Sequence, residues 1–221
     1  GATSQKDMET LEKLNLQVPV VLINRRSEKY STVYTDYKAI GFQAASLFRQ
    51  KGYTEAAVFT SKRPYMATGL RTQAFLNACA QIGITVDPEE IFATTNSISG
   101  GVQAAKAYCS ASQPSKVIFC ESDQMALGAI WELNRQGIRL PEDRELLCIG
   151  MMDPEMTEYS SPSLSTIQMD NQEVMERAVD LLMDAISGGP KEPRQIEIPF
   201  QVCLRSTFQV HSSAVKNNFP S

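Results

Sequence analysis

The fold of this chain is decided by residues 116–151, which read KVIFCESDQMALGAIWELNRQGIRLPEDRELLCIGM. Both ends of this stretch, residues 116–120 and 146–151, are short and apolar, as is typical of strands buried on both faces. Between them, residues 122–136 carry apolar side chains at the spacing of an amphipathic helix. A buried strand, a helix and a second buried strand predict a parallel unit in which the helix crosses over the sheet.

The same alternation extends over most of the 221 residues. Apolar or extended stretches predict further strands at residues 19–24, 31–35, 56–59, 91–93, 165–167 and 195–207. Helical spacing predicts helices at residues 37–51, 66–82, 99–110 and 170–186. In the helix at 66–82 the apolar residues Leu70, Ala74, Ala78 and Ile82 lie on one face. Four such units between residues 35 and 151 predict an α/β fold with one complete, doubly wound parallel-sheet subdomain.

The remaining elements are too few for a second complete subdomain. Residues 1–36 and 169–198 supply two or three strands and two helices, which cannot enclose a core of their own. We therefore expect them to form a partial N-terminal subdomain whose opening strands precede this chain. Residues 37–168 and 199–210 form the predicted C-terminal subdomain, and residues 211–221 are expected to be a disordered tail.

Composition and charge argue against several functional classes. The chain has 21 Lys and Arg against 25 Asp and Glu, a net charge of −4, so it is poorly suited to binding nucleic-acid phosphates. No apolar run approaches the roughly 18 residues that span a bilayer, and no signal peptide precedes the first helix. Five cysteines without a CxxC pair, and a single histidine at His211, predict a cytoplasmic protein with reduced thiols and no metal or cofactor.

Catalytic motifs are absent from the sequence. It contains no GxSxG, HExxH, GxxxxGK[ST] or GxGxxG pattern in the required context. The one histidine lies in the predicted tail, so the commonest general base is lacking as well. We therefore expect a binding protein and not an enzyme.

Polar side chains follow the predicted strands where each strand ends, and open parallel sheets bind ligands outside these carboxyl ends. The candidate stretches are Thr60–Tyr65 followed by Arg71, Thr94–Asn96, Glu121–Asp123 and Met152–Glu155. Together they predict a site for a small polar ligand. Arg71 is the strongest candidate, because a guanidinium facing a cleft needs an anionic or hydroxyl partner. Other interpretations stay open: Ser122 or Asp123 caps its helix, and Asp153 is a turn residue.

Several motifs in the correct order resemble the effector-binding domain of lactose/galactose-repressor-type (LacI/GalR) transcription regulators. They are Pro19–Asn24, Glu121–Ala129, Gly137–Asp143, Ser163–Ile167, Ile198–Phe200 and Arg205–Thr207. The resemblance covers roughly residues 5–208. It implies a bacterial homodimer with the two-subdomain fold of periplasmic sugar-binding proteins, and crossovers near residues 35–37, 167–170 and 198–201. A small effector, a sugar or related polar metabolite, would change the angle between the subdomains and thereby the DNA affinity of a helix-turn-helix that precedes this chain.

The resemblance also implies ligand contacts, residue by residue. Asn24 stands at a cleft-facing polar position, Arg71 at the position of the ligand-gripping arginine, and Ser122 where an Asn commonly reaches a sugar hydroxyl. Tyr65 and Thr95 stand at wall positions. With the two aspartates from the strand ends, the predicted ligand-binding residues are Asn24, Tyr65, Arg71, Thr95, Ser122, Asp123 and Asp153.

Two positions depart from the pattern of the family. Met152 replaces an aspartate that usually anchors the ligand, and Met169 stands where a polar crossover residue can occur. A cleft with fewer polar anchors holds a less polar ligand, or no ligand at all.

The helix at 122–136 carries a second apolar stripe that indicates a partner. Met125, Ala129 and Leu133 form one stripe, which can cover the sheet. Leu127, Ile130 and Trp131 form another, offset by about 140° at 100° per residue. We expect this second stripe, with Tyr159 nearby, to form a symmetric dimer interface. The alternative is that a loop of the same chain covers it.

Two further functions compete with a cytoplasmic regulator. A periplasmic sugar-binding protein of a transporter shares the architecture, but five unpaired cysteines and a second apolar stripe favour the regulator. An enzyme on the same scaffold is the third. The sequence upstream of Gly1 would separate the first two, since it would contain a helix-turn-helix or a secretory signal.

Overall fold

The computed structural model describes residues 9–11, 13, 18–62, 66–151, 154–190 and 192–210, with only the backbone of residues 66–68 and 154. The predicted site residues Tyr65 and Asp153, together with Met152 and the tail at 211–221, lie outside these ranges. The strands are β1 (Val21–Ile23), β2 (Ser31–Tyr34), β3 (Ala57–Ser61), β4 (Ile91–Thr94), β5 (Val117–Cys120), β6 (Glu145–Gly150), β7 (Ser165–Met169), β8 (Gln195–Glu197) and β9 (Phe200–Cys203). The helices are α2 (Tyr37–Gln50), α3 (Met66–Ile82), η1 (Pro88–Glu90), α4 (Ile98–Cys109), α5 (Asp123–Arg135), α6 (Pro154–Glu158) and α7 (Asn171–Ile186).

The larger of two sheets has the strand order β4-β3-β5-β6-β7-β9. Its first five strands are parallel, which confirms the predicted fold class, and only β9 runs antiparallel, against β7. In this register Cys120 pairs with Phe59 of β3 and with Cys148 of β6. The carboxyl ends of the central strands therefore lie at one edge of the sheet, where the segments that follow them can meet.

Local sequence signals set the ends of the helices. The side chains of Asp36, Ser97, Ser122 and Asp170 accept backbone N–H groups at the start of α2, α4, α5 and α7. Gly52 follows α2 with a φ of 84°, a left-handed conformation that glycine adopts without steric cost.

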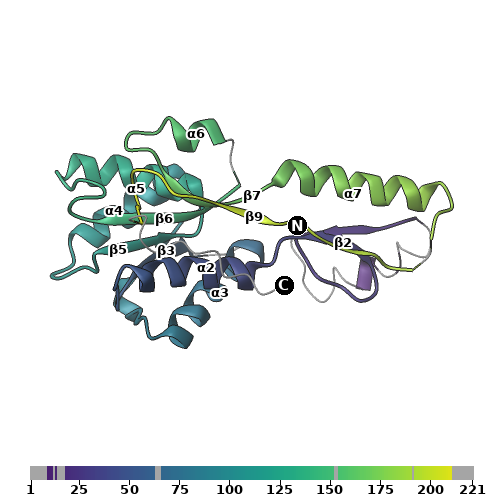
Figure 1. Ribbon diagram of the computed structural model, residues 1–221, viewed down its shortest axis with the longest axis horizontal. Helices are drawn as coiled ribbons and strands as arrows, with labels where there is room; N and C mark the ends of the chain where they lie inside the picture. Colours follow the sequence, from purple (N-terminus) through teal and green to yellow (C-terminus); the bar gives the residue numbers. More distant parts are fainter. Residues whose placement is uncertain are drawn as a thin grey trace.

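Helices cover both faces of the large sheet, α2 and α3 on one side and α4 and α5 on the other (Figure 1). On the first side Phe75 stacks on Phe119 with ring centroids 3.9 Å apart. On the second side α4 and α5 approach closely at glycines. A Cβ on Gly128 would lie 1.9 Å from the carbonyl oxygen of Ile98, so only glycine fits there.

The stripe predicted for α3 is only partly buried. Ala78 is 4% exposed, and Ala74 and Ile82 pack partly buried against the core, but Leu70 is 45% exposed. The most buried residues of α3 are Arg71, Thr72, Phe75, Ala78 and Cys79. The stacking of Phe75 on Phe119 sets the rotation of the helix, because the large ring buries more apolar area than the smaller side chains do.

The smaller sheet has the strand order β1-β2-β8, all parallel, and is covered on one face by α7. Its core consists of Val33, Val174, Ala178, Leu181 and Ile198. The chain passes between the two sheets at residues 35–36, 170 and 198–199. Figure 1 shows α7 and β2 extending to one side of the large sheet. The assignment of the two sheets to separate subdomains stays a prediction. No helix in the described ranges is both long and apolar enough to cross a membrane.

Candidate functional site

Arg71 is buried at the carboxyl edge of the large sheet, with a relative exposure of 4%. Its Nη1 donates to the carbonyl oxygen of Glu121 at 3.4 Å, and its Nη2 contacts the sulfur of Met151. The guanidinium carbon lies 5.6 Å from the centroid of the Tyr37 ring, within the range of a cation–π contact. The buried Nε has no hydrogen-bond acceptor among the described residues, so it retains a free donor.

Beneath Arg71 lies the buried carboxylate cluster of Glu121, Thr60, Ser61 and Thr72. The first three belong to the candidate stretches named from the sequence, but their bonding to one another and the part of Thr72 were not predicted. The Glu121 side chain is fully buried. Its Oε2 accepts the hydroxyls of Thr60 at 2.6 Å and Thr72 at 2.9 Å, and its Oε1 accepts the hydroxyl of Ser61. A buried acidic residue next to a strand end was the available signal, but its three partners come from other elements.

Ser122 and Thr95 lie at the same edge. The Ser122 hydroxyl donates to Asn96 Oδ1 at 2.6 Å and accepts the Met125 N–H at 3.4 Å, so it caps α5. Thr95 is exposed, and its hydroxyl lies 3.0 Å from that of Ser97. Both side chains are thus near the edge, but the polar atoms of Ser122 already have partners within the protein.

The carboxylate of Asp123 makes its contacts within the protein. It is 2% exposed, and its Oδ2 accepts the Met151 N–H at 2.7 Å. Its Oδ1 lies 3.4 Å from the Cys148 sulfur and 3.5 Å from the Thr166 hydroxyl. The carboxylate therefore joins the start of α5 to the ends of β6 and β7. Burial raises the pKa of the Cys148 thiol well above its ordinary value, so the thiol remains protonated and can donate to Asp123.

A cavity of about 370 Å³ lies where the chain first passes between the two sheets, and we call it the hinge cavity. It takes its walls from the end of β1, residues 34–38 and one face of α3. The lining residues are Asn24, Arg25, Arg26, Tyr34, Thr35, Asp36, Tyr37, Lys38, Leu70, Gln73, Ala74 and Asn77. Of the predicted ligand-binding residues that lie within the described ranges, Asn24 alone lines it, although Arg71 reaches its wall through Tyr37. The exposed Leu70 supplies part of its apolar surface.

Several residues that line the hinge cavity have a buried polar atom without a partner. Within the described part of the chain, four of its lining residues have a buried oxygen or nitrogen that makes no hydrogen bond. They are Asn24 Oδ1, Arg25 Nη1, Thr35 Oγ1 and Tyr37 OH. Asn24 has a φ of 54°, a left-handed conformation that asparagine tolerates better than most residues. Since an unpaired buried polar group is costly, these four residues are candidates for hydrogen bonds to a ligand that binds in the hinge cavity and shifts their side chains.

Several charged groups around the hinge cavity already form ion pairs or hydrogen bonds with neighbouring residues. Arg26 Nη2 lies 3.3 Å from both Asp36 and Glu197, and its guanidinium lies over the Tyr34 ring at 4.5 Å. Asp36 also accepts the N–H groups of Lys38 and Ala39 at the start of α2. The arrangement suits a ligand with several hydrogen-bonding groups and one apolar face. No group of three or more His, Cys, Asp or Glu side chains in the described ranges could hold a metal ion.

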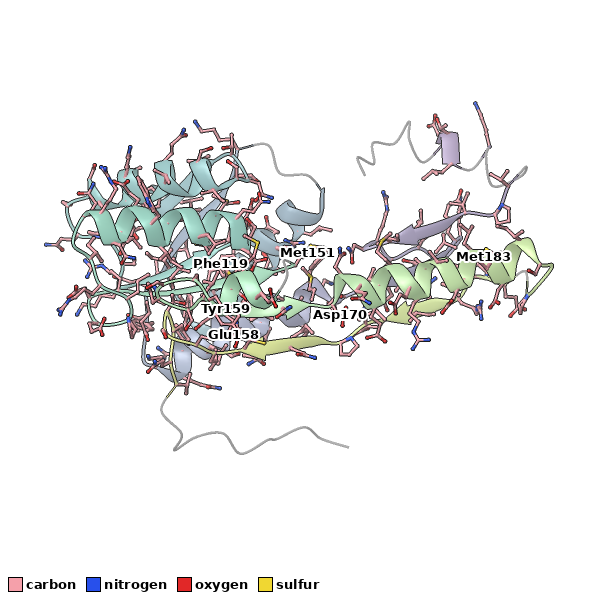
Figure 2. All side chains as sticks on the ribbon, turned by 90° about the horizontal axis from the view of Figure 1, so that it is seen from above. Phe119, Met151, Glu158, Tyr159, Asp170 and Met183 are labelled. Carbon is pink, nitrogen blue, oxygen red and sulfur yellow. The ribbon has the colours of Figure 1, made fainter. Side chains whose placement is uncertain are left out.

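The predicted dimer face is only partly exposed. Trp131 is 54% and Tyr159 is 78% exposed, and Leu127 is partly buried. The prediction that Ile130 belongs to an exposed stripe is wrong, because its side chain is 4% exposed within the chain itself. Ser160 and Ser161 lie beside this face, and Asn134 donates to the Ser161 carbonyl at 3.2 Å. Figure 2 shows Tyr159 on the large-sheet side, and Met151 and Asp170 at the junction between the sheets.

Comparison with known proteins connects this geometry to a family. Residues 45–208 match the family of the periplasmic binding protein-like domain. A LacI family transcription regulator from Clostridium acetobutylicum is 35% identical, with a TM-score of 0.87 over 93% of this chain and 76% of that one. The chain belongs to the LacI family. This confirms the resemblance noted in the sequence and the periplasmic-binding-protein-like fold.

Curated LacI-type relatives are transcriptional repressors. The chain is 30% identical to the HTH-type transcriptional repressor CytR of Escherichia coli K12 over 85% of its own length and 55% of that protein. It is also 30% identical to the repressor PurR of Vibrio cholerae, over 76% of its length and 49% of that protein. The chain thus spans about half the length of these curated relatives. A LacI family regulator from Enterococcus faecalis with bound ribose shares the fold, with a TM-score of 0.79 at 23% identity.

Proposed function

We propose that this LacI-family chain is the effector-binding and dimerisation region of a cytoplasmic bacterial transcription regulator and not an enzyme. The effector is a small polar molecule such as a sugar. DNA binding belongs to a helix-turn-helix in another part of the full-length protein. The similarity to LacI-family regulators favours this function over a sugar-binding protein of a transporter.

The unpartnered polar atoms of the hinge cavity carry this proposal. Asn24 and Arg25 follow β1 of the small sheet, whereas Thr35 and Tyr37 belong to the passage into the large sheet. A ligand that bonds to both groups would bind one relative arrangement of the two sheets more tightly than others. Such differential affinity is what shifts a conformational equilibrium. The shift would then alter the DNA affinity of the full-length protein.

The test is calorimetric titration of the full-length protein with sugars, sugar phosphates and nucleobases. Tyr37→Phe removes only a hydroxyl that has no partner in the described structure. It should leave thermal stability unchanged or raise it, because the unpaired hydroxyl is lost, and weaken binding about 2- to 10-fold, the effect of one neutral hydrogen bond. Tyr53→Phe is the matched control, because Tyr53 donates to Glu145 at 2.7 Å, away from the cavity. This control should lose stability and keep its affinity. If no compound in the panel binds, or if Tyr37→Phe binds as wild type does, the proposal fails.

We propose that the dimer forms through Leu127, Trp131 and Tyr159, with Ile130 packing beneath them. The exposed indole of Trp131 lies beside Ser160, and the very exposed Tyr159 precedes Ser160 in the chain, which supports this face. Trp131→Glu should convert the dimer to monomers in sedimentation velocity. Phe42→Glu is the control, because Phe42 is 49% exposed on α2 and lies outside this face. A Trp131→Glu variant that stays dimeric would exclude this interface.

A further inference from the structure

Glu121 is a residue whose position calls for an explanation beyond packing. It is fully buried, and all of its side-chain hydrogen bonds in the described structure come from three neutral hydroxyls. Burying a carboxylate is costly unless hydrogen bonds compensate for the lost water. An apolar side chain would fill the same space without that cost. A fully bonded buried carboxylate therefore indicates that the elements it joins must keep one orientation relative to each other.

The contacts of Glu121 converge on the first turns of α3. Its carboxylate accepts the hydroxyl of Thr72, which follows Arg71 in the chain. Its own carbonyl oxygen accepts Nη1 of Arg71. One residue after β5 therefore holds two successive residues of α3, one through its side chain and one through its backbone.

The same carboxylate fixes the position of α3 relative to the sheet. Thr60 and Ser61 are the last residues of β3, and both donate to Glu121. The Thr60 and Thr72 hydroxyls also lie 2.9 Å from each other. Without the carboxylate, these two hydroxyls would lose their shared acceptor, and the weak bond of Arg71 to the Glu121 carbonyl at 3.4 Å would be the remaining link from this residue to α3. Rotation of α3 about its axis would then move Arg71 away from the Tyr37 ring.

We propose that Glu121 is a positioning residue, which holds the Arg71 guanidinium against Tyr37 at the wall of the hinge cavity. This role rests on the proposed effector site, because Arg71 is the group that Glu121 orients toward it. Glu121 itself does not touch the ligand. The Thr72 hydroxyl transmits its effect to α3.

The experiment follows the Arg71 side chain directly, without a ligand. The Nε–H signal of Arg71 in a ¹⁵N–¹H NMR spectrum is assigned by its loss in Arg71→Lys, and its hydrogen-exchange rate is measured. Glu121→Gln preserves shape but replaces an acceptor oxygen with an NH₂ donor facing hydroxyls. Thr72→Val removes the linking hydroxyl, and Thr72→Ser restores it. Both Glu121→Gln and Thr72→Val should shift the signal and speed its exchange about tenfold, as expected for the loss of one or two hydrogen bonds.

Two variants serve as controls. Thr72→Ser should restore the wild-type signal, because only the hydroxyl matters. Glu132→Gln changes another fully buried glutamate, which pairs with Arg135 at 3.3 Å in α5, and should leave the Arg71 signal in place. If Glu121→Gln does not fold, the comparison of Thr72→Val with Thr72→Ser tests the proposal by itself. An unchanged Arg71 signal in folded Thr72→Val, or an equal change in Thr72→Ser, overturns the proposal. Since no ligand is present, this outcome is independent of the titration that tests the effector site.

Discussion

Replacement of Asp123 tests whether its carboxylate stabilises the fold or contacts the ligand. Its bond to the Met151 N–H at 2.7 Å is short and charge-assisted, and such bonds contribute about 1.5–3 kcal/mol. The contacts to Cys148 and Thr166, at 3.4 and 3.5 Å, are longer and contribute about 1 kcal/mol together. The position in the first turn of α5 adds about 0.5 kcal/mol through the helix dipole. Asp123→Ala should therefore lower the free energy of unfolding by about 3–4.5 kcal/mol.

Urea unfolding followed by fluorescence measures this loss. Trp131 is the only tryptophan and lies in α5, so its emission reports on the large sheet and its helices. Asp123→Asn retains an acceptor oxygen for the Met151 N–H and should lose about half as much. Asp143→Ala, which removes an exposed partner of Arg139, should leave the unfolding midpoint unchanged. A stable Asp123→Ala protein that has lost effector affinity would refute the reasoning and restore Asp123 as a ligand contact.

Two further changes test the packing of the large sheet. Gly128→Ala places a Cβ against the Ile98 carbonyl and should cost about 3 kcal/mol in urea unfolding, whereas wild-type stability would mean that α4 and α5 lie further apart. Burial raises the pKa of Cys79 from its ordinary 9.0 to about 12, so above pH 9 the unfolded chain releases a proton that the folded chain retains. Stability is thus complete below pH 9 and falls as the pH rises, by about 1.4 kcal/mol at pH 10 from this thiol. Cys79→Ala should remove that part of the slope; an unaltered alkaline slope would contradict the assignment.

The sequence predicted the order and type of the elements, but not how each helix is rotated. For α5 the stripe of Met125, Ala129 and Leu133 is fully buried, as its spacing indicated. For α3 the same reasoning placed Leu70 on the apolar stripe, although Leu70 is exposed and Phe75 faces the sheet. Periodicity finds a helix with two apolar stripes, but the stacking partner Phe119 lies 44 positions along the chain and decides which stripe is buried.

For the candidate site as well, the sequence predicted where residues lie but not how their polar atoms are bonded. The rule that ligands bind beyond the carboxyl ends of parallel strands placed Arg71, Ser122 and Asp123 at the correct edge. It could not tell which of their polar atoms are already bonded within the protein. Ser122 is bonded to Asn96, and Asp123 to Met151, a residue 28 positions away. The hinge cavity was not predicted, because its walls come from three separate segments.

The sequence alone determined the order and type of the elements, since the apolar spacing and the capping residues act between near neighbours in the chain. Only the tertiary structure decided which polar groups are left without partners. Whether a hydroxyl or a carboxylate is satisfied depends on atoms that distant segments bring within 3 Å, as Thr60 and Thr72 are brought to Glu121. Local patterns carry no information about such distances, so they could name candidate residues at the sheet edge but could not show which residues around the hinge cavity have unpaired polar atoms.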